Sequence, residues 1–303
     1  MAVIAESTRI GACEAYPFPG YPESLGWPPW TVPTGRIIDL PGRGSTYFVD
    51  SVPADGPTYV LLHSLACTGL MTWCPVLDVV RQFGRVVVFD QRGHGQGISS
   101  PRFLLEDCAD DVVAVADALG LRTFVPVGYS MGSMVAQLVW KRHRQRVDGL
   151  VLCAASASVT RASYERLATG IFAALIEAFT PVPRPPSQMP CVEEPVRGDH
   201  QWVFDQFRST APAAITRAIA ELVRFDSRSW ITDVDVPTSV VITMRDRVFS
   251  AQRQQSLADQ IPGAHTVTVD AGHARCTLQP DKFGPGLHQA VDSVHRRAVA
   301  LSA

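Results

Sequence analysis

The sequence predicts an α/β fold, a mostly parallel and doubly wound sheet with an inserted helical cap. Two observations predict the sheet. Short apolar runs such as residues 58–62 and 85–89 alternate with runs of helical periodicity such as residues 105–119. Continuous apolar runs of this kind suit parallel strands that helices cover on both faces. The cap is predicted because the alternation stops after residue 153 and returns at residue 237.

Length and composition are those of one large globular domain with an insertion. The chain has 303 residues, 46% of them apolar and 18% charged, which is enough for a sizeable core. A net charge of -2 gives no electrostatic basis for binding nucleic acid or an acidic membrane surface. The sequence has no run long and apolar enough to span a bilayer, and a charge at Glu6 interrupts the N-terminus before any signal-length apolar run. We therefore expect a cytoplasmic protein.

The cysteines indicate neither a metal nor a redox site. They are seven in number and none forms a Cys-x-x-Cys pair, which is the spacing that zinc and dithiol sites favour. We expect most of them to be small core hydrophobes in a reducing compartment. The positions are Cys13, Cys67, Cys74, Cys108, Cys153, Cys191 and Cys276.

Residues 1–35 are predicted to be an N-terminal extension rich in proline, glycine and aromatic residues. Proline excludes a regular helix or a central strand there. The extension is either a loose leader or a segment that packs Trp27 and Trp30 on the body of the protein, because aromatic side chains gain much from burial.

The core is predicted to comprise residues 36–153 and 237–303. Residues 36–40 and 46–50 are expected to form a hairpin. Further strands are predicted at residues 58–62, 85–90, 124–127, 147–153, 239–243 and 265–269. Helices between and after them are predicted at residues 105–119, 131–143, 252–260 and 287–301.

The cap is predicted to comprise residues 154–236. Residues 164–179 and 213–225 have helical patterns, and the proline-rich stretch 181–199 between them resembles a flexible connection. Aromatic side chains of the cap either line a substrate pocket or form the core of the cap itself. The pocket candidates are Phe172, Phe179 and Trp202.

Gly128-Tyr129-Ser130-Met131-Gly132 joins a strand-like run to a helix-like run. A strand that turns sharply into a helix strains its turn residue, and flanking glycines let the two elements approach closely. Ser130 would project at the carboxyl edge of the sheet, near the positive end of the helix dipole. The motif predicts a nucleophilic serine, with a chance match to a five-residue pattern as the alternative.

A nucleophilic serine needs a base, and the base needs an acceptor that fixes its tautomer. His273 follows the last predicted strand and is the predicted base. His63 and His94 also lie in loops at strand ends and are rivals, although bracing of those loops by ring-to-backbone hydrogen bonds explains them better. The remaining histidines are predicted to be surface or structural residues: His143, His200, His265, His288 and His295.

Asp246 is the predicted acid because it follows the strand before that of His273. The chain order Ser, Asp, His favours this assignment. A surface ion pair with a neighbouring arginine is the alternative reading of Asp246. Asp90, at the end of another strand, and Asp270, close to His273 in sequence, are the rival acids.

Acyl transfer also needs hydrogen-bond donors at the developing oxyanion. The backbone N–H of Met131, directly after the serine, is one predicted donor. The other is the backbone N–H of Leu65, in the loop after residues 58–62.

These motifs together resemble the α/β-hydrolase superfamily over roughly residues 36–300. The residues that carry the resemblance are His63-Ser64-Leu65, Phe89-Asp90-Gln91-Arg92-Gly93-His94-Gly95, Gly128-Tyr129-Ser130-Met131-Gly132, Asp246 and Gly272-His273. Many relatives have His-Gly and Gly-Gly where this chain has His63-Ser64 and Gly132-Ser133, which affects the expected geometry of the oxyanion loop.

Two narrower resemblances refine the expectation. Residues 105–111 and 151–154 resemble a group of actinobacterial α/β hydrolases regarded as serine esterases. His63-Ser64-Leu65 followed by Met71-Thr72-Trp73 is similar to the oxyanion loop of enol-lactonases of aromatic catabolism.

The residues and the resemblance imply a cofactor-free serine hydrolase that cleaves a carboxylic ester of a small-molecule acyl substrate. Lactone or thioester hydrolysis, carbon–carbon bond hydrolysis and acyl transfer are the alternatives among enzymes. Carbon–carbon hydrolases often carry an aromatic residue after Gly-His, whereas Ala274-Arg275 follows here. A ligand receptor on the same fold is the rival of another class. The sequence leaves the natural substrate and the oligomeric state open.

Overall fold

The computed structural model describes residues 30–51, 56–160, 196–198, 200–273 and 279–302. The predicted helix at residues 164–179 lies outside the described residues. So does most of the predicted extension, residues 1–29.

The core is a mixed, mostly parallel sheet of eight strands in the order β10-β9-β7-β6-β4-β5-β3-β2, so the predicted fold class is confirmed. The hairpin β2–β3 pairs antiparallel at one edge, and the other neighbouring strands pair parallel. The strands are β2 (Arg36–Leu40), β3 (Gly44–Asp50), β4 (Thr58–Leu62), β5 (Arg85–Phe89), β6 (Val125–Tyr129), β7 (Leu150–Cys153), β9 (Thr238–Thr243) and β10 (His265–Val269). Strand β6 lies between β4 and β7, in the interior of the sheet.

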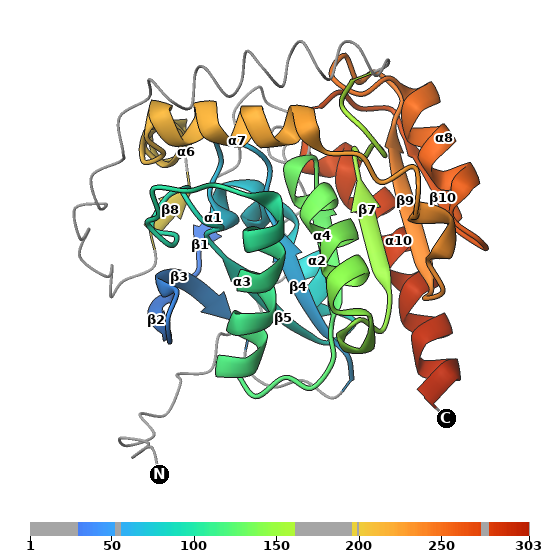
Figure 1. The fold of residues 1–303 in the computed structure, drawn as a ribbon, viewed down its shortest axis with the longest axis horizontal. Helices are drawn as coiled ribbons and strands as arrows, with labels where there is room; N and C mark the ends of the chain where they lie inside the picture. Colours follow the sequence, from blue (N-terminus) through green and yellow to red (C-terminus); the bar gives the residue numbers. More distant parts are fainter. Residues whose placement is uncertain (1–29, 52–55, 161–195, 199, 274–278, 303) are drawn as a thin grey trace.

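Helices cover both faces of the sheet (Figure 1). Side chains of α3 (Leu105–Ala118), α4 (Met131–Arg142) and α8 (Ala251–Gln260) share one hydrophobic cluster with one face of the strands. Those of α1 (Gly69–Trp73), α2 (Leu77–Arg81) and α10 (Pro280–Ser302) share a second cluster with the other face. Three short 3-10 turns complete the layers at η1 (Cys74–Val76), η2 (Arg144–Arg146) and η3 (Ile231–Asp233).

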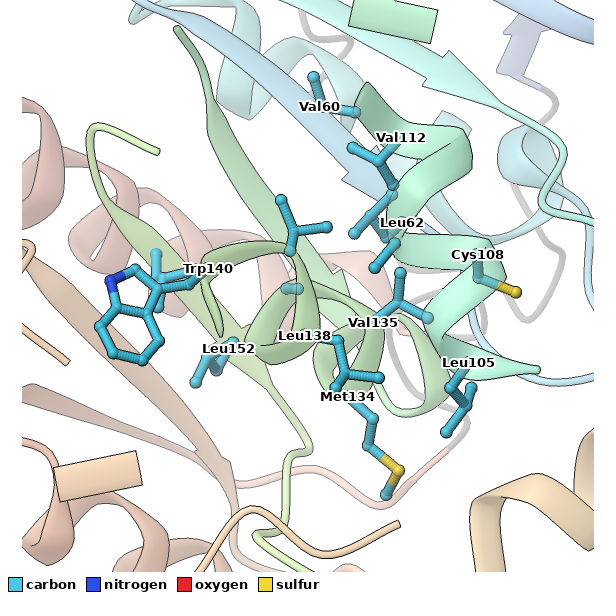
Figure 2. Close-up of a cluster of buried hydrophobic side chains, with 14 of the residues drawn as sticks. Val60, Leu62, Leu105, Cys108, Val112, Met134, Val135, Leu138, Trp140 and Leu152 are labelled. Carbon is cyan, nitrogen blue, oxygen red and sulfur yellow. The ribbon is translucent and has the colours of Figure 1, made fainter. Parts of the chain in front are cut away.

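The two clusters follow from the alternation of side chains along each strand. In β4, Val60 and Leu62 belong to the first cluster, while Tyr59 and Leu61 belong to the second, as the two-residue period of a strand requires. Figure 2 shows the first cluster, where strands meet α3 and α4. Because both faces are dry, the polar groups of the parallel strands concentrate at the strand ends, where a site is expected.

Helices α6 (His200–Arg208) and α7 (Pro212–Arg224) lie across one end of the sheet (Figure 1). Two hydrogen bonds join them to loops of the core. The Thr68 hydroxyl donates to Gln206 Oε1 at 2.8 Å, and the Gly95 amide donates to Thr210 Oγ1 at 3.1 Å. These helices belong to the region predicted as the cap, and we keep its description as a separate cap domain as a proposal.

A small second sheet was not predicted. Strand β1 (Trp30–Val32) pairs antiparallel with β8 (Val196–Gly198), so the end of the predicted extension pairs with the predicted flexible connection. The interpretation of residues 196–198 as a flexible connection is therefore wrong. Each partner is a three-residue segment 164 or more positions from the other, and such a pairing leaves no periodic signal in either segment.

Helix α10 begins at Pro280, seven residues before the predicted start. The prediction treated Pro285 and Gly286 as helix breakers, but Pro285 lies inside the helix. Phe283 is fully buried and its ring lies 5.4 Å from that of Tyr129. Tertiary packing of this first part of the helix outweighs its low intrinsic propensity.

Candidate active site

Ser130 occupies a strained turn between β6 and α4. Its backbone lies at φ 54° and ψ -114°, a region that non-glycine residues rarely adopt and that is found mostly at functional sites. The two glycines of the motif are needed for space. A Cβ on Gly128 would lie 2.2 Å from the Gly132 carbonyl oxygen, and one on Gly132 would lie 2.1 Å from that of Leu62. The sharp turn is therefore possible only with glycine at both positions.

The structure brings Ser130, His273 and Asp246 into one hydrogen-bonded row. Ser130 Oγ lies 2.8 Å from His273 Nε2, and His273 Nδ1 lies 2.7 Å from Asp246 Oδ2. The Asp246 side chain is fully buried, whereas that of His273 remains 22% exposed. An imidazole with a carboxylate on one nitrogen and a hydroxyl on the other can take the hydroxyl proton and hold the resulting charge.

Asp246 is held as an ionised acceptor. Burial raises the pKa of its carboxyl, but the hydrogen bond and charge of His273, the Thr243 hydroxyl and the Phe249 amide outweigh burial and hold the pKa below its ordinary value. Backbone amides of Val248 and Phe249 donate to Oδ1 at 2.7 and 2.9 Å. The predicted alternative, a surface ion pair with an arginine, does not describe this carboxyl.

The rival acid Asp270 lies elsewhere. Its carboxylate pairs with Arg245 at 2.5 Å, and both side chains are more than half exposed. It therefore takes the arginine that was considered as a partner for Asp246.

His273 is positioned by contacts from three elements. The Tyr129 hydroxyl donates to the His273 carbonyl oxygen at 2.8 Å. The Phe249 ring meets the imidazole edge-on, with centroids 5.6 Å apart. The loop after β10 thus carries the ring back over the end of β6, where Ser130 stands.

The two predicted oxyanion donors lie on neighbouring segments. Met131 is the first residue of α4, and the first four N–H groups of a helix have no partner within it. Leu65 follows His63-Ser64 in the loop after β4. A Cβ on Gly132 would meet the carbonyl oxygens of both Leu62 and His63, so this loop packs directly on the first turn of α4. Their role as oxyanion donors remains a proposal.

The rival histidines are fully buried and bound to backbone. His63 Nδ1 lies 2.8 Å from the Ser64 carbonyl oxygen, so it carries the proton, and Nε2 accepts from the Gln91 amide at 2.8 Å. His94 Nδ1 lies 3.0 Å from the Arg92 carbonyl oxygen. Burial lowers the pKa of His63 to about 3 and that of His94 to about 4. Both rings therefore brace loops as neutral groups, in agreement with the preferred reading.

Two polar residues behind Asp246 were not predicted. The Thr243 hydroxyl donates to Asp246 Oδ2 at 2.8 Å, and the fully buried Gln254 bonds to Thr243 in turn. A threonine at the carboxyl end of a strand, three residues before the acid, was the available signal. It is weak because β-branched residues are common in strands for packing reasons alone.

Of the predicted pocket residues, Phe172 and Phe179 lie outside the described residues. Trp202, in α6, is half-buried and packs against the second core cluster, which fits either a pocket wall or the core of the cap. Cys67, Cys74, Cys108 and Cys153 are free thiols. In the ranges that the structure describes, no group of three or more His, Cys, Asp or Glu side chains is arranged to hold a metal ion. No described helix combines the length and apolar character needed to cross a membrane.

Comparison with known proteins identifies the family. The sequence model of the family described as alpha/beta hydrolase fold matches residues 57–214, which is more than half of the chain. The chain belongs to the α/β hydrolase fold family. The predicted resemblance to this superfamily is thereby confirmed.

Curated α/β hydrolases of several activities are similar to this chain. It is 26% identical to the protein named "Putative carbamate hydrolase RutD" of Agrobacterium fabrum over 246 residues, 78% of this chain and 93% of the relative. It is 23% identical to 3-oxoadipate enol-lactonase 1 of Acinetobacter baylyi over 234 residues, 76% of this chain and 87% of the relative.

A solved α/β hydrolase structure has the same fold. The enol-lactonase of Burkholderia xenovorans LB400 superposes with a TM-score of 0.67 at 22% identity, covering 85% of this chain and all of the other. The predicted kinship with enol-lactonase-type hydrolases is confirmed at the level of the family.

Proposed function

We propose that this α/β hydrolase is a serine hydrolase that cleaves a carboxylic ester through an acyl-enzyme. The observation that carries the proposal is the row of Ser130, His273 and Asp246, joined at 2.8 and 2.7 Å at the end of β6. A strained serine, an imidazole that faces its hydroxyl and a buried carboxylate behind the imidazole are the three groups that nucleophilic acyl transfer requires.

The proposed reaction begins when His273 Nε2 takes the Ser130 proton as Oγ attacks the carbonyl carbon of the ester. The imidazolium is stabilised by Asp246, which also keeps the proton on Nδ1 of the resting ring. The negative charge then develops on the former carbonyl oxygen. Backbone N–H groups of Met131 and Leu65 are proposed to receive it, with the dipole of the twelve-residue helix α4 aligned in support.

Collapse of the tetrahedral intermediate breaks the bond to the alcohol oxygen. The imidazolium of His273 gives its proton to this leaving group, and the acyl group stays on Ser130 Oγ. A water molecule then attacks the acyl carbon, again with His273 as the base, and the carboxylic acid leaves. Every proton in this cycle passes through Nε2, so no cofactor enters the proposal.

A lactone is the second substrate class that an observation favours, because a curated relative is named an enol-lactonase. A lactone is a cyclic ester, so the attack and the proton transfers are unchanged, but the leaving alcohol stays tethered to the acyl group. Thioester hydrolysis, carbon–carbon bond hydrolysis and acyl transfer remain possible on the same residues and have no such support. Parallel assays of p-nitrophenyl esters and of lactones distinguish the two favoured classes.

Replacement of Ser130 by alanine tests the proposal. We expect Ser130→Ala to lose ester turnover and labelling by a fluorophosphonate probe, while its circular dichroism spectrum stays that of the wild type. The fold should persist because alanine and serine tolerate φ 54° about equally. Ser256→Ala, an exposed serine of α8, is the matched control and should keep both activity and labelling. Labelling that survives in Ser130→Ala would overturn the assignment of the nucleophile.

A further inference from the structure

The hydrogen-bond row that begins at Ser130 continues beyond Asp246 into α8. Asp246 Oδ2 accepts from the Thr243 hydroxyl at 2.8 Å as well as from His273. Thr243 Oγ1 in turn lies 2.9 Å from Gln254 Nε2. Both residues are fully buried, and Gln254 stands on the face of α8 that packs on the sheet. The inference below rests on the proposed function.

The orientation of the Gln254 amide is determined by backbone groups. Its Oε1 accepts from the Thr243 backbone amide at 3.0 Å, and its Nε2 donates to the Phe249 carbonyl oxygen at 2.6 Å. A flipped amide would place an oxygen against a carbonyl oxygen and an NH₂ group against an N–H, which breaks two buried hydrogen bonds. The NH₂ group therefore faces Thr243 Oγ1.

This orientation also decides where the Thr243 hydroxyl proton points. Oγ1 receives a hydrogen bond from Gln254 Nε2, so its own proton must find an acceptor on another side. Asp246 Oδ2 lies at 2.8 Å, whereas Gln254 Oε1 lies at 3.3 Å. The proton is directed to the carboxylate, because a charged acceptor at the shorter distance forms the stronger bond.

The carboxylate of Asp246 thereby has donors on both oxygens. Oδ1 takes the amides of Val248 and Phe249, and Oδ2 takes the Thr243 hydroxyl beside His273 Nδ1–H. Rotation of the carboxylate about χ2 would break all of these bonds together. We propose that Thr243 and Gln254 are positioning residues of the reaction, which keep Asp246 Oδ2 aligned on His273.

The expected kinetic signature follows from this role. Neither residue is proposed to touch the substrate, so removal of the Thr243 hydroxyl should leave KM near the wild-type value. The carboxylate becomes free to rotate, the imidazolium of the transition state is held less well, and kcat falls. The loss of one hydrogen bond to a charged group corresponds to about a ten- to hundredfold decrease in kcat.

The experiment compares Thr243→Val with Thr243→Ser, using kcat and KM for a p-nitrophenyl ester. Valine keeps the shape of threonine without the hydroxyl, so the fold should persist, and serine keeps the hydroxyl. We expect the decrease in kcat with valine and near-normal kcat with serine. Thr238→Val is the matched control. It removes another buried hydroxyl from β9, at the opposite end of the strand, where Oγ1 donates to the Val236 carbonyl oxygen at 2.9 Å.

Gln254→Met reaches the same hydroxyl from the other side and should also lower kcat without raising KM. Gln252→Met changes an exposed glutamine of the same helix and is its control. Thr243→Val is then combined with Asp246→Asn. Because the hydroxyl acts through the carboxylate, the double variant should be no slower than Asp246→Asn alone.

Three outcomes would overturn the inference. They are an unchanged kcat in Thr243→Val, an equal loss in Thr243→Ser and Thr243→Val, or a further multiplicative loss in the double variant. Failure of the proposed function looks different, because Ser130→Ala would then keep its activity and its fluorophosphonate labelling. Inactive Ser130→Ala with normal Thr243→Val leaves the serine hydrolase standing and removes only the role of Thr243 and Gln254.

Discussion

Two buried carboxylates stand at the carboxyl ends of strands of the same sheet, and they differ in every other respect. Asp90 follows β5 and accepts the amides of Gly69 and Gln96 at 2.8 and 2.9 Å. Asp246 follows β9 and accepts two amides as well, but His273 lies on its free side. Burial raises the pKa of Asp90 to about 6, in spite of both amide bonds, whereas the pKa of Asp246 lies below its ordinary value.

The comparison teaches that burial and backbone hydrogen bonds do not by themselves make an acid of the proposed kind. Asp90 joins three loops, since Thr46 also donates to its backbone carbonyl oxygen at 2.7 Å. A Cβ on Gly95 would lie 2.3 Å from its Oδ2, which leaves little room for a histidine ring on that side. We infer that Asp90 organises loops and that Asp246 serves the reaction.

The largest expected effect separates the two carboxylates by activity. Asp246→Asn should lower kcat by roughly ten-thousandfold, because asparagine favours the wrong tautomer of the histidine. Asp90→Asn should keep kcat within the same order of magnitude as the wild type and lose stability instead, since its NH₂ group cannot accept a backbone amide. Steady-state kinetics on one p-nitrophenyl ester measure both. A normal Asp246→Asn together with an inactive Asp90→Asn would reverse the two roles.

The next effect concerns the stability of the loop that follows Asp90. Arg92 forms a two-pronged ion pair with Asp111 at 2.8 Å on each contact, and both side chains are buried. Asp111→Asn leaves a buried guanidinium poorly paired, and we expect a loss of about 3 kcal/mol in the free energy of unfolding. Urea denaturation measures it.

The control for this prediction is the exposed pair of Arg245 and Asp270. Asp270→Asn should cost about 0–1 kcal/mol, and it should leave ester turnover unchanged if Asp246 is the acid. Equal losses of stability in the two variants would show that burial of the Arg92 pair contributes nothing.

The pH dependence of stability should have opposite signs at the two carboxylates. Asp90 has a folded pKa near 6, above the 3.8 of the unfolded chain, so its contribution to stability is present below pH 3.8 and is lost as the pH rises through 6. Asp246 has a lowered folded pKa, so its contribution is present above pH 3.8 and is lost as the pH falls through the folded value.

Urea denaturation between pH 3 and 8 of the wild type, Asp90→Asn and Asp246→Asn measures both contributions as differences from the wild type. Relative to Asp90→Asn, the wild type should lose stability between pH 4 and 6. Relative to Asp246→Asn, it should show no change there and a loss below pH 4. Parallel curves for the two variants would contradict the assigned environments.

The smallest effect is expected outside both loops, in α6. If Trp202 lines the acyl pocket, Trp202→Ala should change the preferred acyl length more than the rate on acetyl esters, because each methylene held in a pocket is worth roughly 1–3 kcal/mol. Phe207→Ala removes an exposed aromatic side chain of the same helix and should leave the profile unchanged. A chain-length series of p-nitrophenyl esters checks both. An unchanged profile in Trp202→Ala would assign this residue to the core of the cap.

The layers of the fold could be predicted from local sequence because each element carries its own period. In α3, the buried residues Leu105, Cys108, Val112 and Val115 recur at helical spacing, and Gly120 at φ 67° follows the end of the helix. Strands β4 and β5 are continuous apolar runs for the same reason that they are buried on both faces. The strained serine could be predicted too, because only glycine fits at Gly128 and Gly132.

Other features depend on contacts between segments far apart in the chain. The β1–β8 pair and the early start of α10 arise from such contacts, which leave no local period. The same holds within the site. Sequence order favoured Asp246, yet Asp90 was an equally plausible strand-end carboxylate until the position of the His273 ring was known.

The sequence by itself determined the layered α/β sheet, the serine turn and the order of the reactive residues, because these are properties of short segments. Only the tertiary structure decided which carboxylate meets the imidazole, and that Thr243 and Gln254 stand behind it. Hydrogen bonds between side chains of different elements depend on distances of about 3 Å. Those distances are set by how β9, α8 and the loop after β10 pack together, and no local pattern of residues encodes that packing.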